Sequence, residues 1–283
     1  MSTDDAHRPV VGFVGLGDQG LPIAQAIADG GFPLHVWARR PESLEALDGH
    51  PYTAEPGLTE LGTVSDVVIL CLPEDHDVHA VALDGGLLAV MRPGSVLVNQ
   101  GTGLPAEAVR LGELTEPYGV EFVDAPVSGG NAVAVARQLT TIVGGADSAV
   151  AKVRPIFETF SKEVIHVGPT GSGQYGKLFN NTLMMMNHKN LIDVLDVAQA
   201  ADVPLPGLLQ VLGSGSARSF ALEAIGPSIT PVNVEHLRGL ELIDMDVFAE
   251  AVSFLGELSA AVVERAVAGA DGLPDLTRVV LKP

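Results

Sequence analysis

Three glycines spaced as Gly-x-Gly-x-x-Gly directly follow the first apolar run of the chain, and they constrain its fold more than any other feature. The run Val10–Val14 predicts a buried strand, and the residues after Gly20, as far as about Asp29, have helical spacing. Gly15 permits a tight turn between the two, Gly17 lets a pyrophosphate approach the backbone, and Gly20 lets helix and strand pack closely. The pattern therefore predicts a dinucleotide-binding βαβ unit with the phosphates at the N-terminus of the helix.

The glycine loop and the end of the next apolar run together indicate which nucleotide is bound. The residues expected to contact the cofactor are consecutive in the loop: Gly15, Leu16, Gly17, Asp18, Gln19 and Gly20. After the run 34–37, an NAD-selective site usually has an acidic residue for the ribose hydroxyls, but this chain has Arg39 and Arg40. Two guanidinium groups suit a 2′-phosphate. We therefore expect NADP(H) to be preferred over NAD(H), the alternative being a pair of solvated surface arginines.

Short β-branched runs alternate with helix-like stretches through the first part of the chain. The runs cover residues 10–14, 34–37, 67–72, 95–99, 120–123 and 139–143. Strands separated by helices form parallel βαβ units. We therefore predict an α/β Rossmann domain with a mostly parallel sheet at residues 1–167.

The pattern changes after about Gly168. Residues 172–201 contain no proline, have glycines only near their start, and carry apolar residues at helical spacing, which predicts one long helix. The remainder is largely helical, with breaks at residues 204–206, 226–227 and 272–274. The long helix should join the Rossmann domain to an all-α domain, residues 168–283, that begins with this helix.

The acidity of the chain excludes two classes of partner. Its 283 residues carry a formal net charge of −19, which repels nucleic-acid phosphates and anionic membranes. Residues 1–5 are polar and acidic, unlike a signal peptide, and no apolar run approaches the ~20 residues that cross a bilayer. The single cysteine, Cys71, lies in an apolar run and is most simply a buried apolar group. We expect a cytoplasmic protein with a small-molecule substrate and, because no His, Cys, Asp and Glu residues have ligand spacing, no metal.

The segment Asp124–Gly130 is a first candidate for substrate binding. It directly follows the predicted strand 120–123 and reads Asp-Ala-Pro-Val-Ser-Gly-Gly. The turn of Ser128, Gly129 and Gly130 exposes a hydroxyl and backbone N–H groups that can hold a carboxylate. A tight turn without a function explains the same residues equally well.

The segment Gly168–Asn181 is the candidate for proton transfer. Its glycines start the long helix, and Lys177 and Asn181 lie four residues apart, so they share one helix face. A lysine in a partly desolvated cleft exchanges protons near neutral pH, and an amide one turn further on can fix it or the substrate. Taken singly, Lys177 would be a solvated helix lysine, but the glycine-rich turn before it favours a catalytic role.

These motifs together resemble the β-hydroxyacid dehydrogenase family, which includes 3-hydroxyisobutyrate dehydrogenase, tartronate semialdehyde reductase and, more distantly, 6-phosphogluconate dehydrogenase. The glycine fingerprint, the Asp-Ala-Pro-Val-Ser-Gly-Gly segment and Gly-x-x-Gly-x-Gly-x-x-x-Lys-x-x-x-Asn occur in the family order over about residues 9–200. The resemblance implies a helical domain that mediates dimer formation, and hydride transfer between NADP(H) and a small 3-hydroxyacid or semialdehyde. It implies these roles: Lys177 as general acid/base, Asn181 as its helper, Ser128, Gly129 and Gly130 at a substrate carboxylate, and Thr102 near the nicotinamide.

The chain departs from the family pattern in the helical domain. Family members usually carry a Lys-Asp pair there, but the nearest matching stretch, residues 242–246, has Ile243 in the lysine position. Imine reductases share the architecture and typically lack the active-site lysine. Retention of Lys177 favours the hydroxyacid or semialdehyde, whereas Ile243 and the run Leu183–Met186 leave an imine or ketone reductase open. The methionines of that run are also explained as core or dimer interface.

Two questions stay open at the level of sequence. A non-catalytic NADP(H)-binding redox sensor is the alternative outside the enzyme class, although such a protein would need neither Lys177 nor Asn181. His188 and Lys189, further along the long helix, either line the cleft or belong to a solvated face.

Overall fold

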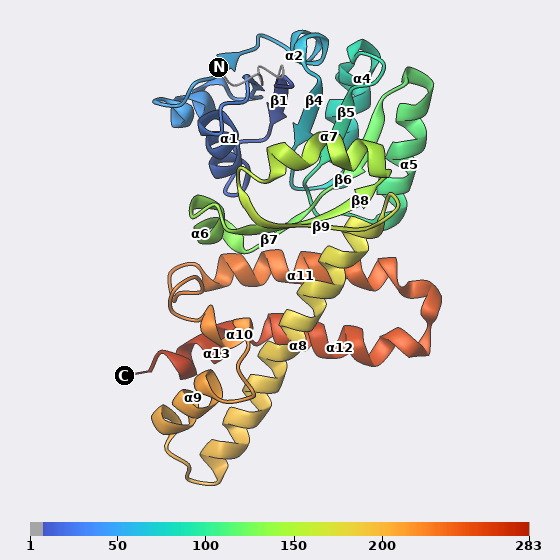
Figure 1. Ribbon diagram of the computed structural model, residues 1–283. Coiled ribbons are helices and arrows are strands. Elements are labelled where there is room, and N and C mark those ends of the chain that lie inside the picture. The colour runs from blue at the N-terminus through green and yellow to red at the C-terminus, as the bar shows by residue number, and fades with distance from the viewer. Residues whose placement is uncertain (1–7, 283) are drawn as a thin grey trace. The chain divides into compact units, whose positions relative to one another are not determined.

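The computed structural model describes residues 8–282, so residues 1–5, interpreted above as unlike a signal peptide, lie outside the described part. The chain divides into two compact units, Met1–Lys177 and Leu178–Pro283 (Figure 1). The sequence pattern places the boundary ten residues earlier, at 167/168. The difference arises because the first turns of the long helix belong to the first unit.

The first unit is built on one sheet, which has nine strands within residues 8–282. The strands are β1 (Val11–Val14), β2 (Leu34–Trp37), β3 (Thr53–Ala54), β4 (Val67–Leu70), β5 (Val96–Asn99), β6 (Glu121–Asp124), β7 (Val127–Ser128), β8 (Leu139–Gly145) and β9 (Ser161–Gly168). Their order is β3-β2-β1-β4-β5-β6-β8-β7, with β9 also paired to β8. The strands from β3 to β6 are parallel, β8 runs antiparallel to β6 and β7, and β9 is parallel to β8. The order 3-2-1-4-5-6 is that of a Rossmann fold, as predicted.

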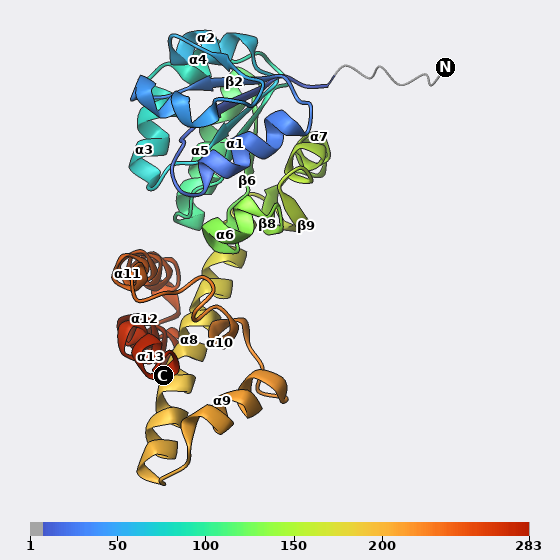
Figure 2. The same ribbon diagram turned by 90° about the vertical axis from the view of Figure 1, so that its left-hand side faces the viewer.

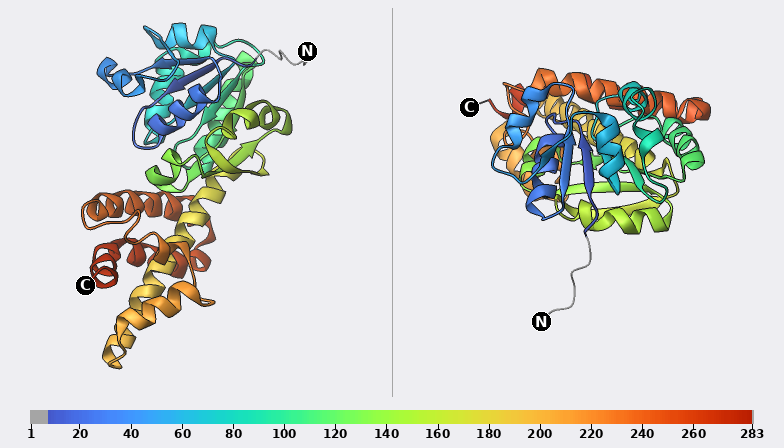
Figure 3. Two further views of the ribbon diagram at one scale, coloured as in Figure 1. Left: turned by 60° about the vertical axis from the view of Figure 1, so that its left-hand side comes forward. Right: turned by 90° about the horizontal axis from the view of Figure 1, so that it is seen from above.

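Helices cover both faces of this sheet (Figures 2 and 3). They are α1 (Gly20–Asp29), α2 (Leu58–Val64), α3 (Asp75–His79), α4 (Leu87–Val90), α5 (Pro105–Thr115), α6 (Gly130–Val135) and α7 (Asp147–Phe157), with the short turns η1 (Pro41–Leu47), η2 (Ala80–Asp84) and η3 (Glu116–Tyr118). One core joins α1, α6 and α7 to the sheet through side chains such as Ile23 and Val153. The second core joins helices α2, α3, α4 and α5 to the sheet, through side chains such as Leu61 and Leu111. Burial on both faces explains why β1, β4 and β5 are continuous apolar runs.

The second unit is helical and contains most of α8 (Ser172–Ala200). The other helices are α9 (Leu205–Ser214), α10 (Phe220–Glu223), α11 (Val234–Ala251), α12 (Glu257–Asp271) and α13 (Leu273–Val280), with the turn η4 (Ser253–Leu255). In Figure 2, α11 to α13 lie on one side of α8 and α9 and α10 on the other. The three predicted breaks fall between helices, since Pro204 precedes α9, Gly226 follows α10 and Gly272 separates α12 from α13.

Packing in the second unit resolves two residues that the sequence left open. His188 is fully buried, which excludes a solvated face for its side chain. Met185 is also buried, in a cluster with Met245 and residues of α12, so the methionine run is in part core. Lys189 forms an ion pair with Asp193, one turn further along α8. Within residues 8–282, no helix has both the length and the hydropathy to span a bilayer.

Candidate active site

The turn from β1 to α1 has two glycines that the fold requires and one that faces open space. Gly15 has a φ of +105°, and a Cβ on it would overlap the carbonyl oxygen of Cys71. A Cβ on Gly20 would overlap the carbonyl oxygen of Gly15. At Gly17 no atom lies within 4 Å of where a Cβ would be, so the backbone there is open to a ligand. Packing thus requires Gly15 and Gly20, and the approach of a pyrophosphate at Gly17 stays a prediction.

Helix α1 begins without a side-chain cap and with no acidic residue in its first turn. In its first turn the Leu21 N–H donates to the Gly17 carbonyl oxygen at 3.0 Å and Pro22 has no N–H, so an anion would be met by the amides at the very start of the helix and by its dipole. Two side-chain amides close in sequence to the predicted cofactor residues have buried atoms without a hydrogen-bond partner among the described residues. These atoms are the oxygen of Gln19 and both the oxygen and the nitrogen of Gln100. Buried polar groups are normally hydrogen-bonded. The open backbone at Gly17 and these amides fit a phosphate-bearing dinucleotide.

Arg39 and Arg40 lie just beyond the end of β2, the strand next to β1. Because Trp37 pairs with Val14, the two strands end at the same edge of the sheet. Both guanidinium groups are exposed, and neither forms an ion pair within the described range. They are therefore available to an anionic group on a nucleotide bound at the glycine loop.

The loop that carries Thr102 follows β5 and is held on both sides of that residue. The Nε2 atom of Gln174 donates to the Gly101 carbonyl oxygen at 2.8 Å, and the Gly103 N–H donates to Gln174 Oε1 at 2.9 Å. The loop is further fixed by Asp75 Oδ2, which accepts from the Leu104 N–H at 2.9 Å. Gln174 belongs to the first turn of α8, so the structure brings the predicted nicotinamide loop and the predicted proton-transfer helix together.

Asp124 joins the second motif to the same helix. Its carboxylate is fully buried and accepts from the N–H groups of Gly171, at 2.8 Å, and Gln174, at 2.9 Å. Burial raises the pKa of Asp124, and the hydrogen bonds from the start of α8 oppose that shift. An acidic group at a helix N-terminus satisfies backbone amides that have no partner within the helix. The aspartate of the Asp-Ala-Pro-Val-Ser-Gly-Gly segment therefore acts as a long-range cap of α8.

The Ser-Gly-Gly turn lies between β7 and α6 and is tied to the cofactor loop. Ser128 is half-buried, while Gly129 and Gly130 have φ values of +139° and +75°. The Asn131 side chain, next in the chain, donates to the carbonyl oxygen of Asp18 at 2.5 Å. The turn and the glycine loop are thus neighbours although 113 residues separate the bonded pair.

Lys177 is half-buried and lies one helical turn after Gln174. Asn181 is one turn further along α8, in the second unit, where its Nδ2 atom donates to Asp244 Oδ2 of α11 at 2.5 Å. Asp244 directly follows Ile243 and stands in the aspartate position of the family's Lys-Asp pair, in the stretch 242–246. Ile243, which stands in the lysine position, is 52% exposed.

Sequence reasoning did not identify three residues of this arrangement: Gln174, Asp124 and Asp244. Gln174 and Asp124 lie inside quoted motifs, but a glutamine in a helix and an aspartate at a strand end carry no local sign of their partners. Asp244 could have been found, because the family pair directs attention to its stretch. Among residues 8–282 no group of His, Cys, Asp or Glu side chains could hold a metal ion.

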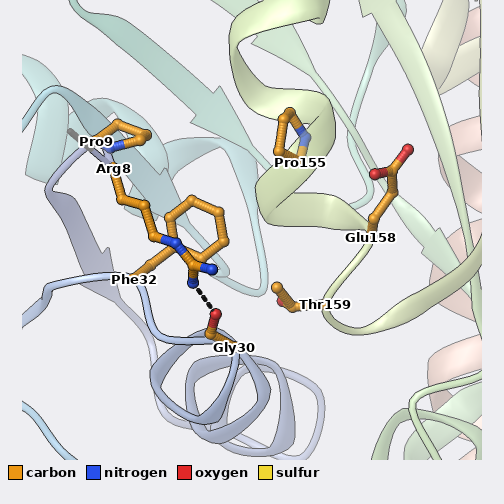
Figure 4. A pocket seen from close by; sticks show the side chains of 7 residues that line it. All are labelled: Arg8, Pro9, Gly30, Phe32, Pro155, Glu158 and Thr159. Atoms are coloured by element: carbon orange, nitrogen blue, oxygen red, sulfur yellow. Dashed lines mark hydrogen bonds between the residues drawn. The ribbon is translucent and has the colours of Figure 1, made fainter. Parts of the chain in front are cut away.

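Two other features of the first unit lie apart from this arrangement. Burial raises the pKa of the Cys71 thiol to about 12, so it is an apolar packing group beneath the glycine loop. A shallow pocket of about 400 Å³ is lined by Arg8, Pro9, Gly30, Phe32, Pro155, Glu158 and Thr159 (Figure 4). Some of its residues directly precede β1 and others directly follow α1, so the pocket lies at the amino ends of the strands, whereas the glycine loop lies at their carboxyl ends. The Arg8 guanidinium covers the Phe32 ring.

Comparisons with known proteins agree with this fold and these motifs. Residues 10–168 match the family model described as the NAD binding domain of 6-phosphogluconate dehydrogenase. The NAD-dependent L-serine dehydrogenase of Pseudomonas aeruginosa is 32% identical over 218 residues, which are 77% of this chain and 73% of that protein. A structure of Mycobacterium tuberculosis 3-hydroxyisobutyrate dehydrogenase with L-serine has a TM-score of 0.83 at 25% identity and covers 96% of this chain and 98% of the other.

A second kind of structural relative has the same fold at lower similarity. The reductive aminase from Aspergillus terreus, in complex with NADPH and ethyl-5-oxohexanoate, has a TM-score of 0.61 at 19% identity and covers 96% of this chain and 98% of the other. At this level of identity the likeness concerns the fold alone.

Proposed function

Because this chain belongs to the family of the 6-phosphogluconate dehydrogenase NAD-binding domain, with hydroxyacid dehydrogenases among its relatives, we propose that it is an NADP(H)-dependent oxidoreductase. Its substrate is a small 3-hydroxyacid or the corresponding semialdehyde. One observation carries this proposal: the loop of Thr102 is bonded to α8 one turn before Lys177. A hydride-transfer loop and a proton-transfer amine are thereby held on one framework.

The chemistry divides between cofactor and protein. The bound nicotinamide supplies hydride to a carbonyl carbon or accepts it from an alcohol carbon. Lys177 Nζ donates a proton to the developing alkoxide oxygen, and in the oxidative direction it removes the proton from the hydroxyl group. Its ammonium charge also stabilises that oxygen. Proton transfer of this kind contributes on the order of 10²- to 10⁴-fold in rate.

Neighbouring residues orient the substrate and the amine. We assign the carboxylate of the substrate to the Ser128 hydroxyl and the N–H groups of Gly129 and Gly130. Asn181 acts as a helper of the lysine, and its hydrogen bond to Asp244 fixes the orientation of its amide. A fixed amide presents its oxygen and nitrogen in one known direction, which a rotating side chain would not.

The preference for NADP(H) rests on Arg39 and Arg40. Their exposed guanidinium groups stand where an NAD-selective site has an acidic residue. The serine dehydrogenase relative is named as NAD-dependent, and the reductive aminase was solved with NADPH, so relatives of this fold use either cofactor. In this proposal the two arginines hold the 2′-phosphate of NADP(H).

An imine or ketone reductase is the second candidate, and Ile243 is the observation that favours it. Its exposed apolar side chain replaces a cation that would attract an acidic substrate. The likeness of fold to a reductive aminase is in keeping with this candidate.

We further propose that the helical unit pairs with a second copy of the chain. Large apolar side chains of this unit are exposed: Phe179, Leu183, Leu240, Phe254 and Leu258. Exposed large apolar side chains of this kind are buried when a partner covers them. Size-exclusion chromatography with light scattering should give twice the chain mass, and a monomer at micromolar concentration would contradict the pairing.

A substrate panel tests the proposed function. Semialdehydes with a carboxylate, simple ketones and cyclic imines are each offered with NADPH and with NADH. Turnover of the semialdehydes with NADPH is expected; reduction of imines alone would show that the hydroxyacid assignment is wrong. A Lys177→Ala variant should keep its NADPH affinity and lose turnover. A redox sensor would instead show no turnover in either protein.

A further inference from the structure

The side chain of Gln174 is fully buried at the start of α8 and forms two hydrogen bonds to one loop. Its amide N–H group meets the Gly101 carbonyl oxygen and its amide oxygen meets the Gly103 N–H, at 2.8 Å and 2.9 Å. These backbone partners require one donor and one acceptor, which only one orientation of the amide provides. Thr102 lies between the two bonded residues.

The loop is closely packed where it makes these bonds. A Cβ on Gly101 would overlap the Leu72 carbonyl oxygen, and a Cβ on Gly103 would overlap the Asp75 carboxylate. The Gly101 N–H also donates to the side chain of Asn99, at 2.9 Å. The loop is therefore packed against its own strand end while Gln174 joins it to the helix.

The helical side of the joint is equally fixed. The backbone N–H of Gln174 donates to Asp124 Oδ2 at 2.9 Å, so both ends of this residue are bonded inside the first unit. Lys177 follows three residues later on the same helix, a rise of about 4.5 Å. The path from Thr102 to Lys177 thus passes through one buried amide and one helical turn.

We propose that Gln174 is a positioning residue for the reaction: it sets the distance between the Thr102 loop and the Lys177 amine. This inference rests on the proposed function, in which the loop borders the nicotinamide and the amine carries the proton. Gln174 touches neither substrate nor cofactor in this role. A displacement of about 1 Å between reacting groups can reduce rates about 10²-fold, so loss of the joint should lower turnover more than cofactor binding.

Two variants of nearly the same size separate positioning from folding. Gln174→Met removes both hydrogen bonds. Gln174→Glu retains both when protonated, since the acid O–H donates to Gly101 and its carbonyl oxygen accepts from Gly103. When ionised, it places a negative charge against the Gly101 carbonyl oxygen. Burial raises the pKa of such a carboxyl, which brings the change into an accessible pH range.

The kinetic measurement is turnover relative to the wild-type chain at each pH from 6 to 9. Gln174→Met should lose about 10- to 100-fold in kcat at every pH, with the NADPH dissociation constant changed about threefold at most. Gln174→Glu should approach wild-type kcat at pH 6 and fall about 10-fold or more by pH 9. The isotope effect with C4-deuterated NADPH should rise in both variants where they are slow, because hydride transfer then limits the rate. Gln138→Glu, at an exposed glutamine outside the site, is the matched control and should follow the wild type.

A measurement without cofactor tests the joint independently of activity. Hydrogen exchange of the Gly103 amide in the apo chain should be faster in Gln174→Met than in the wild type, while the bulk of the sheet stays protected. Unchanged exchange, or a Gln174→Glu pH profile parallel to that of the wild type, would overturn the proposal. So would failure of both variants to fold, since the amide would then be only structural. An inactive wild-type chain would instead refute the proposed function, and this inference with it.

Discussion

The buried imidazole of His188 should make the helical unit lose stability as the pH falls below 6.5. The ring is fully buried, and neither of its nitrogens has a hydrogen-bond partner among the described residues. Burial lowers its pKa from 6.5 to about 4; the backbone of Ala221 lies close enough to offset the shift slightly, though not in hydrogen-bonding geometry. The folded chain therefore holds the ring neutral at pH values where the unfolded chain protonates it.

The size of the effect follows from the shift of the pKa. Above pH 6.5 both states are neutral, and the ring does not contribute to pH dependence. Between 6.5 and 4 only the unfolded state binds the proton, so the free energy of unfolding falls by about 1.4 kcal/mol per pH unit. The loss is about 2 kcal/mol at pH 5 and levels off near 3 kcal/mol below pH 4. Against a typical total of about 5–15 kcal/mol this is measurable.

Urea unfolding of the wild type and of His188→Leu, at pH 7.5 and pH 5, measures the effect. Leucine is similar in size and does not titrate, so the wild type should lose about 2 kcal/mol more than the variant between the two pH values. Carboxylates with lowered pKa, such as Asp29 and Glu121, are present in both chains and cancel. Circular dichroism follows the helices of both units, and fluorescence of the single tryptophan, Trp37, follows the first unit alone and is the internal control. Equal losses in the two chains would refute the reasoning.

Two further substitutions test the cofactor site. Replacing both Arg39 and Arg40 by serine should weaken NADPH binding about 10- to 100-fold and change NADH binding by about threefold at most, because only the 2′-phosphate contacts are lost. Titration of cofactor fluorescence measures both affinities, and equal weakening of the two would contradict the assigned role. Gly20→Ala should lower the stability of the apo chain by about 1–3 kcal/mol and abolish NADPH binding, because the methyl group overlaps the Gly15 carbonyl oxygen. Thermal unfolding measures the stability and the same titration measures the binding. A variant that binds NADPH normally would show that the turn is less tightly packed.

The strands that sequence predicts well are those buried on both faces. In β1, β4 and β5 every residue is buried, so each gives a continuous apolar run. Three strands were not predicted: β3 and β7 have two residues each, and β9 has neither a continuous apolar run nor a regular alternation, since Lys162 and Glu163 are adjacent and Ile165 and Val167 are exposed. The ends of the six predicted strands differ from the observed ones by at most two residues, since turn residues and not the apolar runs determine where pairing stops.

The motifs of the candidate site could be recognised in the sequence because each of them is local. The glycine loop, the Ser-Gly-Gly turn and the pair of Lys177 and Asn181 are each contained in a short segment. The bonds that assemble them are not local: Gln174 reaches 73 residues back to Gly101, and Asn181 reaches 63 residues forward to Asp244. The burial of His188 depends in the same way on helices that come later in the chain. Such contacts follow from the topology, which periodicity alone does not determine.

The capping of α8 by Asp124 has a practical consequence for anyone who separates the nucleotide unit from the rest of the chain. A fragment ending at residue 167, where the sequence pattern changes, would retain nearly all of the sheet and yet strip a buried carboxylate of its two amide donors from Gly171 and Gln174. The loop of Thr102 would lose its two hydrogen bonds to Gln174 in the same cut. The shortest self-sufficient nucleotide fragment therefore extends into the opening turns of the long helix, and ends at Lys177, the boundary of the first unit.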